Sequence, residues 1–518
     1  MKDRLNGLLK DTNNWIFVLV SCFLGIIIHG QIVFNEYVWH DETCMIFGMP
    51  NIRRLSEGRW MMALIMWIQE RFIGKETAGS TYAILGFFIT GITLILIFDI
   101  LEIRSWFARI ALLIVTLASP SVLSSFGYMN SVGYCYAGIL FCTLSAVFIH
   151  YAVDTLEYKY TLLGALFFAC GLATYQCYFS ITTSLLILFL LKSVFLNEND
   201  NKNIILVILK KGITELGALL LGLVTYLVVL GASLEVFNVR LSNYDDINKF
   251  GATSVWGYFQ RVLSAYSEFF SFNRDRSYTF YPFRWKGWWA SAIFVFIASL
   301  ALIIFSLIKA KKWKELVTVL VLVILFPLAV NFDFILYPIN YIHGIHVYSS
   351  VYIFYCIYLF ISSFKGMGPK FEGGILLLGT IWILAIGILY YRYDALCYTQ
   401  LELNQEATIN ELNRLVMRIE STEGYKKEYP IAFVGSEYNM PNVSYNILST
   451  SDNIITNPYT CVISRYSWES FMNLWINYYP EVVMLSDEEI EYYTSMDRPK
   501  YPDDGSVFID DAMVIVNY

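Results

Sequence analysis

Long apolar runs recur along this chain, and they constrain its fold more than any other feature of the sequence. A helix needs about 20 apolar residues to cross the roughly 30 Å hydrocarbon core of a bilayer. Eleven runs approach this length, near residues 15–34, 81–101, 107–125, 132–151, 160–178, 180–196, 212–233, 288–308, 316–336, 347–364 and 373–391. We therefore predict a polytopic α-helical membrane protein with about 11 transmembrane helices.

The composition of the chain agrees with this prediction. Of its 518 residues, 57% are hydrophobic, 17% are aromatic and only 15% are charged. Soluble domains carry about 25% charged residues, and aromatic side chains favour the lipid–water interface. The composition excludes a disordered chain, an ordinary soluble enzyme and a nucleic-acid binder built on a basic surface. We expect membrane lipid, and no nucleic acid, among the partners.

The distribution of basic residues predicts the orientation. A short basic segment with Lys2, Arg4 and Lys10 precedes the first run, which is too long for a signal-peptide core and is interpreted as a retained helix. Lys and Arg then occur in alternate short loops, as Arg104, Arg109, Lys159, Lys192, Lys202, Lys210, Lys211, Lys309, Lys311, Lys312, Lys314, Lys365 and Lys370. By the positive-inside rule these loops and the N-terminus are cytoplasmic. An odd number of spans then places the C-terminus outside.

The C-terminal residues differ from the rest in charge. From Arg392 onward the chain has 8 basic and 20 acidic residues. We predict a transmembrane domain over residues 1–391 and a small extracytoplasmic α/β or α+β domain over 392–518. A helical pattern covers residues 401–419, and strand-like runs cover 431–434, 481–485, 507–509 and 513–516, with a turn at Asp510-Asp511 and a helix beginning at Ser486.

The predicted orientation places two long segments outside, residues 35–80 and 234–287. The first contains an apolar run, Trp60–Ile68, which is too short to span and is expected to lie along the membrane surface. The second contains a dense basic and aromatic stretch, Phe272–Trp289.

An acidic pair follows the first span, in Trp39-His40-Asp41-Glu42. Near an interface, partial loss of water and neighbouring charges can tune a carboxylate to act as a base. The alternative is a pair of solvated loop acids, and the position by itself leaves both interpretations open.

Two groups of cations in the outer segments suggest an anionic ligand. Arg59, in Gly58-Arg59-Trp60, can hold a phosphate by charge-assisted hydrogen bonds, or it can simply anchor the surface helix. Arg274, Arg276, Arg284 and Lys286 lie among Tyr and Trp residues, where they suit an anionic headgroup beside a stacked sugar. An ordinary aromatic belt is the alternative.

Polar residues also stand at the ends of two central spans. Tyr175 and Gln176 end the fifth, and His343 and His346 precede the tenth. Polar groups at membrane depth usually face a cavity or a protein partner. Two His without a carboxylate form a weak metal signal, and the chain has no phosphate-loop, dinucleotide, G-x-S-x-G or HExxH motif. An activated substrate would therefore arrive through the membrane.

The order of these features resembles a known family. A basic N-terminus and one span are followed by an outer acidic pair, Gly58-Arg59-Trp60, a Tyr-Gln pair ending a central span and an extracytoplasmic tail. This pattern, over about residues 10–391, is similar to the bacterial membrane glucosyltransferases related to the serotype-converting O-antigen glucosyltransferases of the GT-C superfamily. The resemblance implies an enzyme of the bacterial cytoplasmic (inner) membrane.

The resemblance also implies an activity and roles for residues. Such enzymes move a sugar from a polyprenyl-phosphate carrier to a hydroxyl of a surface glycan outside the membrane. Asp41 is then the expected base, with Glu42 as the alternative. Donor phosphate binding is expected of Arg59, Arg274, Arg276, Arg284 and Lys286, and sugar or acceptor contacts of Trp39, His40, Trp60, Tyr175, Gln176, His343 and His346. Some GT-C enzymes use a divalent cation and others do not, so this cofactor stays open.

Two other classes of protein fit parts of the sequence. A transporter or flippase of lipid-linked sugars should show two similar halves and polar groups at the midplane. Here the ionisable residues gather at the outer ends, while Asp99 and Glu215 lie near inner ends. A non-catalytic envelope assembly subunit is the third interpretation, and it predicts that Asp41→Asn leaves function intact.

Overall fold

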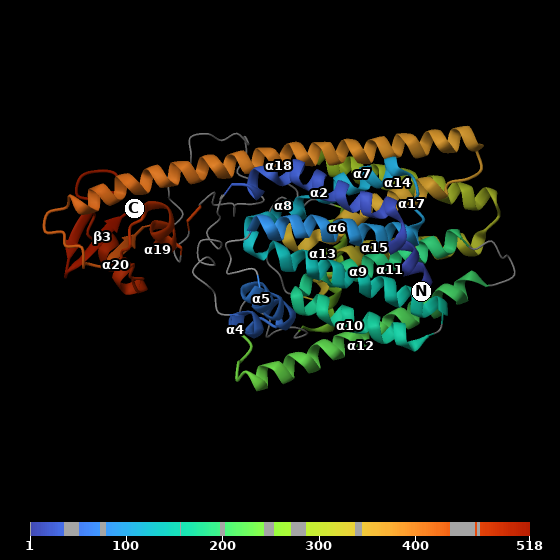
Figure 1. The fold of residues 1–518 in the computed structure, drawn as a ribbon, viewed down its shortest axis with the longest axis horizontal. Helices are drawn as coiled ribbons and strands as arrows, with labels where there is room; N and C mark the ends of the chain where they lie inside the picture. The colour runs from blue at the N-terminus through green and yellow to red at the C-terminus, as the bar shows by residue number, and fades with distance from the viewer. Residues whose placement is uncertain are drawn as a thin grey trace.

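The computed structural model shows a bundle of long helices that continues into a small C-terminal sheet (Figure 1). The structure describes residues 2–35, 51–72, 79–155, 157–196, 203–242, 253–270, 286–336, 344–435, 462–463 and 467–518. Within them, nine helical segments are long and apolar enough to cross a membrane, or ten with a bent pair. This confirms the prediction of a polytopic helical membrane protein.

Each predicted span corresponds to helical structure. The first three are α2 (Thr12–Val33), α6 (Gly79–Leu101) and the bent pair of α7 (Trp106–Leu117) with α8 (Pro120–Ser125). The next three are α9 (Val132–Thr155), α10 (Tyr158–Thr174) and η2 (Gln176–Tyr178) with α11 (Phe179–Phe195). Then follow α12 (Ile204–Val236), α14 (Lys286–Lys309), α15 (Trp313–Val330), η4 (Gly344–Val351) with α17 (Tyr352–Ser363), and α18 (Pro369–Glu420). Helix α10 has only 17 residues and is not among the candidate membrane spans, so the described residues contain nine or ten candidate spans where eleven were predicted.

The 41° bend between α7 and α8 has a cause in the sequence. Pro120 has no backbone N–H and begins the second helix, so the hydrogen-bond ladder is interrupted there. His29 of α2 supplies a hydrogen bond at this break. Its Nε2 lies 2.9 Å from the carbonyl oxygen of Leu117, which can only accept. The other ring nitrogen lies 2.6 Å from the hydroxyl of Tyr398 on α18. The break is therefore tied to both the first and the last span.

Shorter helices complete the membrane part. Helix α1 (Lys2–Lys10) precedes the first span, and Arg4 contacts Asp99 at the end of α6, 2.5 Å from its carboxylate. Helices α4 (Asn51–Ser56) and α5 (Trp60–Phe72) follow the first span, α2, and α5 contains the predicted surface run. Helix α13 (Val255–Phe270) packs against α15 and α16 (Asp333–Leu336). The short helix η1 (Phe126–Ser131) joins α8 to α9.

Helix α18 is a single element of 52 residues, about 78 Å long at 1.5 Å per residue. In Figure 1 it extends along the whole molecule and reaches the C-terminal sheet. The predicted last span and the predicted helix over 401–419 are therefore one helix, and the predicted domain boundary at 391/392 falls inside it. Neither Gly nor Pro occurs between Ile388 and Glu420, so nothing in the local sequence interrupts the helix.

The C-terminal part is a three-stranded sheet with the order β1-β3-β2, flanked by helices. Strands β1 (Ile431–Val434) and β3 (Met513–Asn517) pair in parallel, and β2 (Val507–Asp510) pairs with β3 antiparallel. The expected hairpin forms, but it turns at Asp511 and Ala512, both at positive φ, one residue later than predicted. The run 481–485 forms only an isolated bridge, Val482 to Ile431. Two helical segments, α19 (Trp468–Phe471) and η5 (Met472–Ile476), pack beside the sheet, and α20 (Asp487–Ser495) begins with a Ser486–Glu489 capping box.

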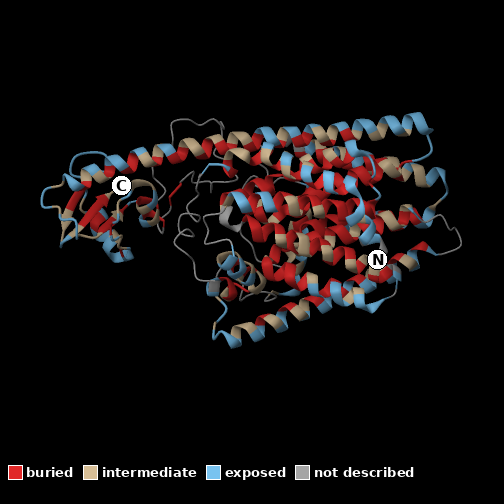
Figure 2. Cartoon of the chain, viewed as in Figure 1, coloured by how far each residue is buried: buried red, intermediate tan, exposed pale blue. Residues whose placement is uncertain are grey.

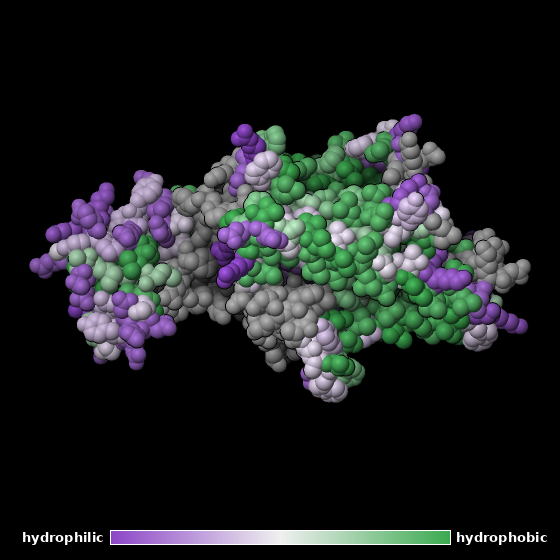
Figure 3. Space-filling view, turned by 90° about the horizontal axis from the view of Figure 1, so that it is seen from below, coloured by the Kyte–Doolittle hydropathy of each residue, from purple (hydrophilic) through white to green (hydrophobic). Residues whose placement is uncertain are grey.

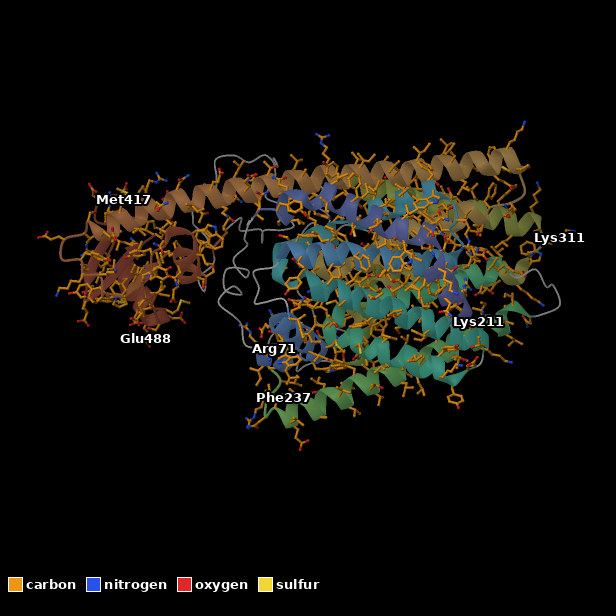
Figure 4. All side chains as sticks on the ribbon, in the orientation of Figure 1. Arg71, Lys211, Phe237, Lys311, Met417 and Glu488 are labelled. Atoms are coloured by element: carbon orange, nitrogen blue, oxygen red, sulfur yellow. The ribbon has the colours of Figure 1, made fainter. Side chains whose placement is uncertain are left out.

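The surface agrees with a multi-pass membrane protein. Buried residues fill the bundle in Figure 2, and apolar residues cover its sides in Figure 3, whereas the C-terminal part is hydrophilic. Large apolar side chains on the outer helices are exposed, among them Val228, Phe294 and Ile324 at 65%, 71% and 60%. In Figure 4, Lys211 and Lys311 lie at the end of the bundle far from the C-terminal sheet, and Arg71 lies at the nearer end. Lys211 and Lys311, from two of the basic loops, thus lie at the same end, as the positive-inside interpretation requires.

Candidate functional site

The candidate site is built on a tight connection between α4 and α5. The backbone N–H of Gly58 donates to Leu55 O at 3.0 Å, and that of Arg59 donates to Arg54 O at 2.9 Å. Gly58 has φ +78°, a conformation that side chains with a Cβ rarely adopt. The glycine therefore ends α4 and turns the chain directly into α5, which brings the charged residues on its two sides together.

Glu57 is the centre of this connection and is only 2% exposed. Its Oε2 accepts a hydrogen bond from Arg54 Nη1 at 3.0 Å and another from Arg59 Nη1 at 2.9 Å. Arg53 Nε lies 3.5 Å from the other oxygen, Oε1. Among the residues that the structure describes, one carboxylate of this cluster therefore faces three guanidinium groups.

Two residues far away in the sequence, Gln176 and Tyr226, hydrogen-bond to the α4–α5 connection. Gln176, the first residue of η2, donates from Nε2 to the carbonyl oxygen of Glu57 at 2.9 Å and accepts from Arg59 Nε at 3.4 Å. Tyr226 of α12 donates to the carbonyl oxygen of Gly58 at 3.0 Å. The glycine is packed so closely that a Cβ there would lie 2.9 Å from the Tyr226 hydroxyl and 3.0 Å from Gln176 Nε2.

Tyr175 extends the cluster towards η4. The guanidinium carbon of Arg59 lies 4.6 Å from the centroid of its ring, a cation–π distance. The Tyr175 hydroxyl lies 2.9 Å from Nε2 of His346 on η4. The break between α10 and η2, where Tyr175 has an extended backbone, turns both Tyr175 and Gln176 towards α4–α5.

This geometry gathers guanidinium groups beside amide, hydroxyl and imidazole groups that can form hydrogen bonds with a polar ligand. The comparison with family models identifies the class. Residues 30–364 match the model described as Glucosyl transferase GtrII. The chain belongs to this family. Comparisons with curated proteins and with solved structures found no match.

Membership of the GtrII family shows a glucosyltransferase, and the structure brings together several residues that the sequence singled out. Arg59, Tyr175, Gln176 and His346 form one connected group. Trp60 lies beside it and packs on the small apolar cluster around Leu55, Phe168 and Tyr226.

Other predicted residues of this GtrII-family chain lie outside the described residues. These are Trp39, His40, Asp41, Glu42, Arg274, Arg276, Arg284 and His343. Lys286 begins α14, but its side chain is also outside the description. Their roles stay predictions. In the part of the chain that the structure describes, no group of three or more His, Cys, Asp or Glu side chains could hold a metal ion.

Four residues around the junction were not singled out from the sequence: Arg53, Arg54, Glu57 and Tyr226. Glu57 directly precedes Gly58-Arg59-Trp60, and it stands three and four residues after Arg54 and Arg53. That spacing brings side chains to one face of a helix and was the available signal. Tyr226 gives no local signal, because it is one of many aromatic residues in an apolar span.

Proposed function

We propose that this glucosyltransferase moves glucose from a polyprenyl-phosphate carrier to a hydroxyl of a cell-surface glycan, on the outer face of the bacterial cytoplasmic membrane. The observation that carries the proposal is the buried arginine-rich junction at Glu57, which the break after α10 contacts through Tyr175 and Gln176. A lipid-linked donor would present both an anionic phosphate and a sugar to such a site.

The orientation of the site supports transfer on the outer face. Helices α4 and α5 lie at the end of the bundle nearer the C-terminal sheet in Figure 1. Lys211 and Lys311 lie at the opposite end in Figure 4. Since basic loops are retained in the cytoplasm, the junction would be extracytoplasmic. The C-terminal domain would then be on the side of the acceptor glycan, where it can bind that glycan or cover the site.

The reaction needs one base and a stabilised leaving group. The bond from glucose C1 to the phosphate oxygen breaks, and its electron pair stays on the phosphate. The acceptor oxygen forms the new bond to C1 and loses its proton to a carboxylate, for which we propose Asp41, with Glu42 as the alternative. Cations near the phosphate stabilise the growing negative charge, and no second carboxylate is needed to protonate the leaving group.

The test uses purified protein in liposomes with radiolabelled polyprenyl-phosphate-glucose and a surface-glycan acceptor. Wild type is compared with Asp41→Asn and with Glu488→Gln, a matched loss of one carboxylate at an exposed position on α20. We expect transfer by wild type and Glu488→Gln, and a loss of about 100-fold or more in folded Asp41→Asn, in line with the size of general base catalysis.

Three other outcomes are informative. Undiminished transfer by Asp41→Asn would move the base, and Glu42→Gln would be measured next. Labelled lipid that crosses the bilayer without transfer would favour the flippase. Wild type without transfer from this donor, but active with a nucleotide sugar, would contradict the proposed carrier.

A further inference from the structure

Among the described residues, the Glu57 junction holds more guanidinium groups than carboxylates. Arg54 and Arg59 both donate to Oε2 of Glu57, at 3.0 and 2.9 Å, so two guanidinium groups share one carboxylate oxygen. The side chains of Arg54, Arg59 and Glu57 are 10%, 11% and 2% exposed. Like charges held this close away from water repel strongly, because the local dielectric is low. A second anion would relieve this repulsion.

Two hydrogen-bond donors on α4 and α5 also lack an acceptor among the described residues. Among the described side chains of α4 and α5, two buried polar atoms have no partner, Arg54 Nε and Trp60 Nε1. Both are N–H donors. A buried donor without a partner destabilises the folded protein, and the more so when the donor is charged. The missing group is therefore rich in acceptors, as the oxygens of a phosphate are.

Burial and an unpaired Nε distinguish Arg54 from its neighbour Arg53 on the same helix. The two residues are adjacent and both contact Glu57, but the side chain of Arg53 is 50% exposed and lies 3.5 Å from Oε1. Water can therefore solvate Arg53. Arg54, with its unpaired Nε, is largely shielded from water.

We propose that Arg54 binds the phosphate group of the lipid-linked substrate, with Glu57 as the residue that positions its guanidinium group. Glu57 occupies Arg54 Nη1, which leaves Nε to face the ligand. This inference rests on the proposed function and adds a binding residue to it.

The reaction increases the charge that Arg54 would meet. The donor phosphate is a diester with one negative charge, and the released polyprenyl phosphate is a monoester with a charge of about −1.5 to −2 near pH 7. A fixed guanidinium donor therefore binds the departing phosphate more tightly than the donor. Such differential binding raises kcat and not only affinity. It also predicts inhibition by the product.

The test measures phosphate binding separately from catalysis. Purified wild type, Arg54→Gln and the matched neighbour Arg53→Gln are heated in nanodiscs with undecaprenyl phosphate, inorganic phosphate or phosphatidylglycerol. A ligand that binds only the folded protein raises its Tm. We expect undecaprenyl phosphate to raise the Tm of wild type and Arg53→Gln but not of Arg54→Gln. We also expect kcat/KM for glucose transfer to fall by about 100-fold in Arg54→Gln, as for loss of a single oxyanion donor.

The proposal would be overturned by equal stabilisation of Arg54→Gln and Arg53→Gln, which would mean that a water molecule completes the Arg54 site. Equal stabilisation by phosphatidylglycerol would also overturn it, because the site would then hold any anionic lipid. If Arg54→Gln does not fold, Arg54→Lys keeps the charge and loses the Nε donor, so it should fold and still bind undecaprenyl phosphate at least 10-fold more weakly. Phosphate binding through Arg54 without glucose transfer would contradict the proposed function and leave this site standing.

Discussion

Arg59 lies over the ring of Tyr175, with 4.6 Å between the guanidinium carbon and the ring centroid. The same guanidinium group donates to Glu57 and to Gln176. A planar guanidinium can make these contacts together, whereas a lysine ammonium cannot. We expect Arg59→Lys to lower glucose transfer by about 10- to 100-fold, which corresponds to the loss of one or two charge-assisted hydrogen bonds. Transfer is measured at saturating donor.

Tyr175→Phe is the control for this prediction. It keeps the ring under Arg59 and removes only the hydroxyl that lies 2.9 Å from His346 Nε2. We expect transfer to fall by less than about 10-fold, the effect of one neutral hydrogen bond. If Arg59→Lys were as active as wild type, the geometry of the guanidinium group would have no part in the reaction.

Glu57→Gln is expected to destabilise the protein. The substitution keeps the shape of the side chain but removes the charge that compensates buried Arg54 and Arg59. Loss of one partner from a buried ion pair costs about 3–5 kcal/mol. The Tm of the purified variant should fall clearly below that of wild type, while exposed Glu488→Gln should leave it unchanged. A Tm equal to that of wild type would show that water already screens the junction.

The parts of the fold that depend on local pattern could be predicted. The apolar runs predicted the spans, and β1 has the predicted bounds, because a hydrophobic run and its alternation are properties of neighbouring residues. The continuity of α18 was missed, because the change from apolar to charged residues near Arg392 suggested a boundary. In fact the helix leaves the bundle without a break, and only its surroundings change.

The site could be predicted only in part, for the same physical reason. The sequence singled out Arg59 and Gln176 separately. The contact of Gln176 with Glu57 joins residues 119 positions apart, and no local pattern indicates such a contact. Glu57 was overlooked because a charged residue between a helix and a glycine is normally a solvated one. Its burial results from the packing of α10 and α12 on the α4–α5 connection.

Asp333 is expected to make stability depend on pH. It follows α15, is 1% exposed, and its burial raises the pKa of the carboxyl to about 7, with a smaller contribution from Glu268 on α13. In the unfolded chain the pKa is about 3.9. Between these values the folded state binds the proton and the unfolded state does not, so stability falls as pH rises from about 4 to about 7 and then levels off.

The variant Asp333→Asn tests this directly, because an amide does not ionise. Tm values of wild type and variant are compared at pH 5 and pH 8. We expect the wild type to lose more stability than the variant between the two, so that the variant is relatively more stable at pH 8. The exposed substitution Asp487→Asn is the control and should keep the pH dependence of wild type. Parallel curves for wild type and Asp333→Asn would mean that Asp333 ionises as it does in water.

Gly58→Ala should disrupt the site more than any other change of one methyl group. The alanine would have to adopt φ +78°, and its Cβ would lie 2.9 Å from the Tyr226 hydroxyl and 3.0 Å from Gln176 Nε2. Strain of this kind costs about 1–3 kcal/mol. Gly231→Ala in α12 is the matched control, because nothing lies within 4 Å of its added Cβ and alanine favours a helix. We expect Gly58→Ala to lower both the Tm and glucose transfer, and Gly231→Ala to leave transfer unchanged.

The double variant Gly58→Ala/Tyr226→Phe removes the nearer contact and should recover part of the lost stability. If the double variant were no more stable than Gly58→Ala, the backbone conformation, and not the clash with Tyr226, would set the cost.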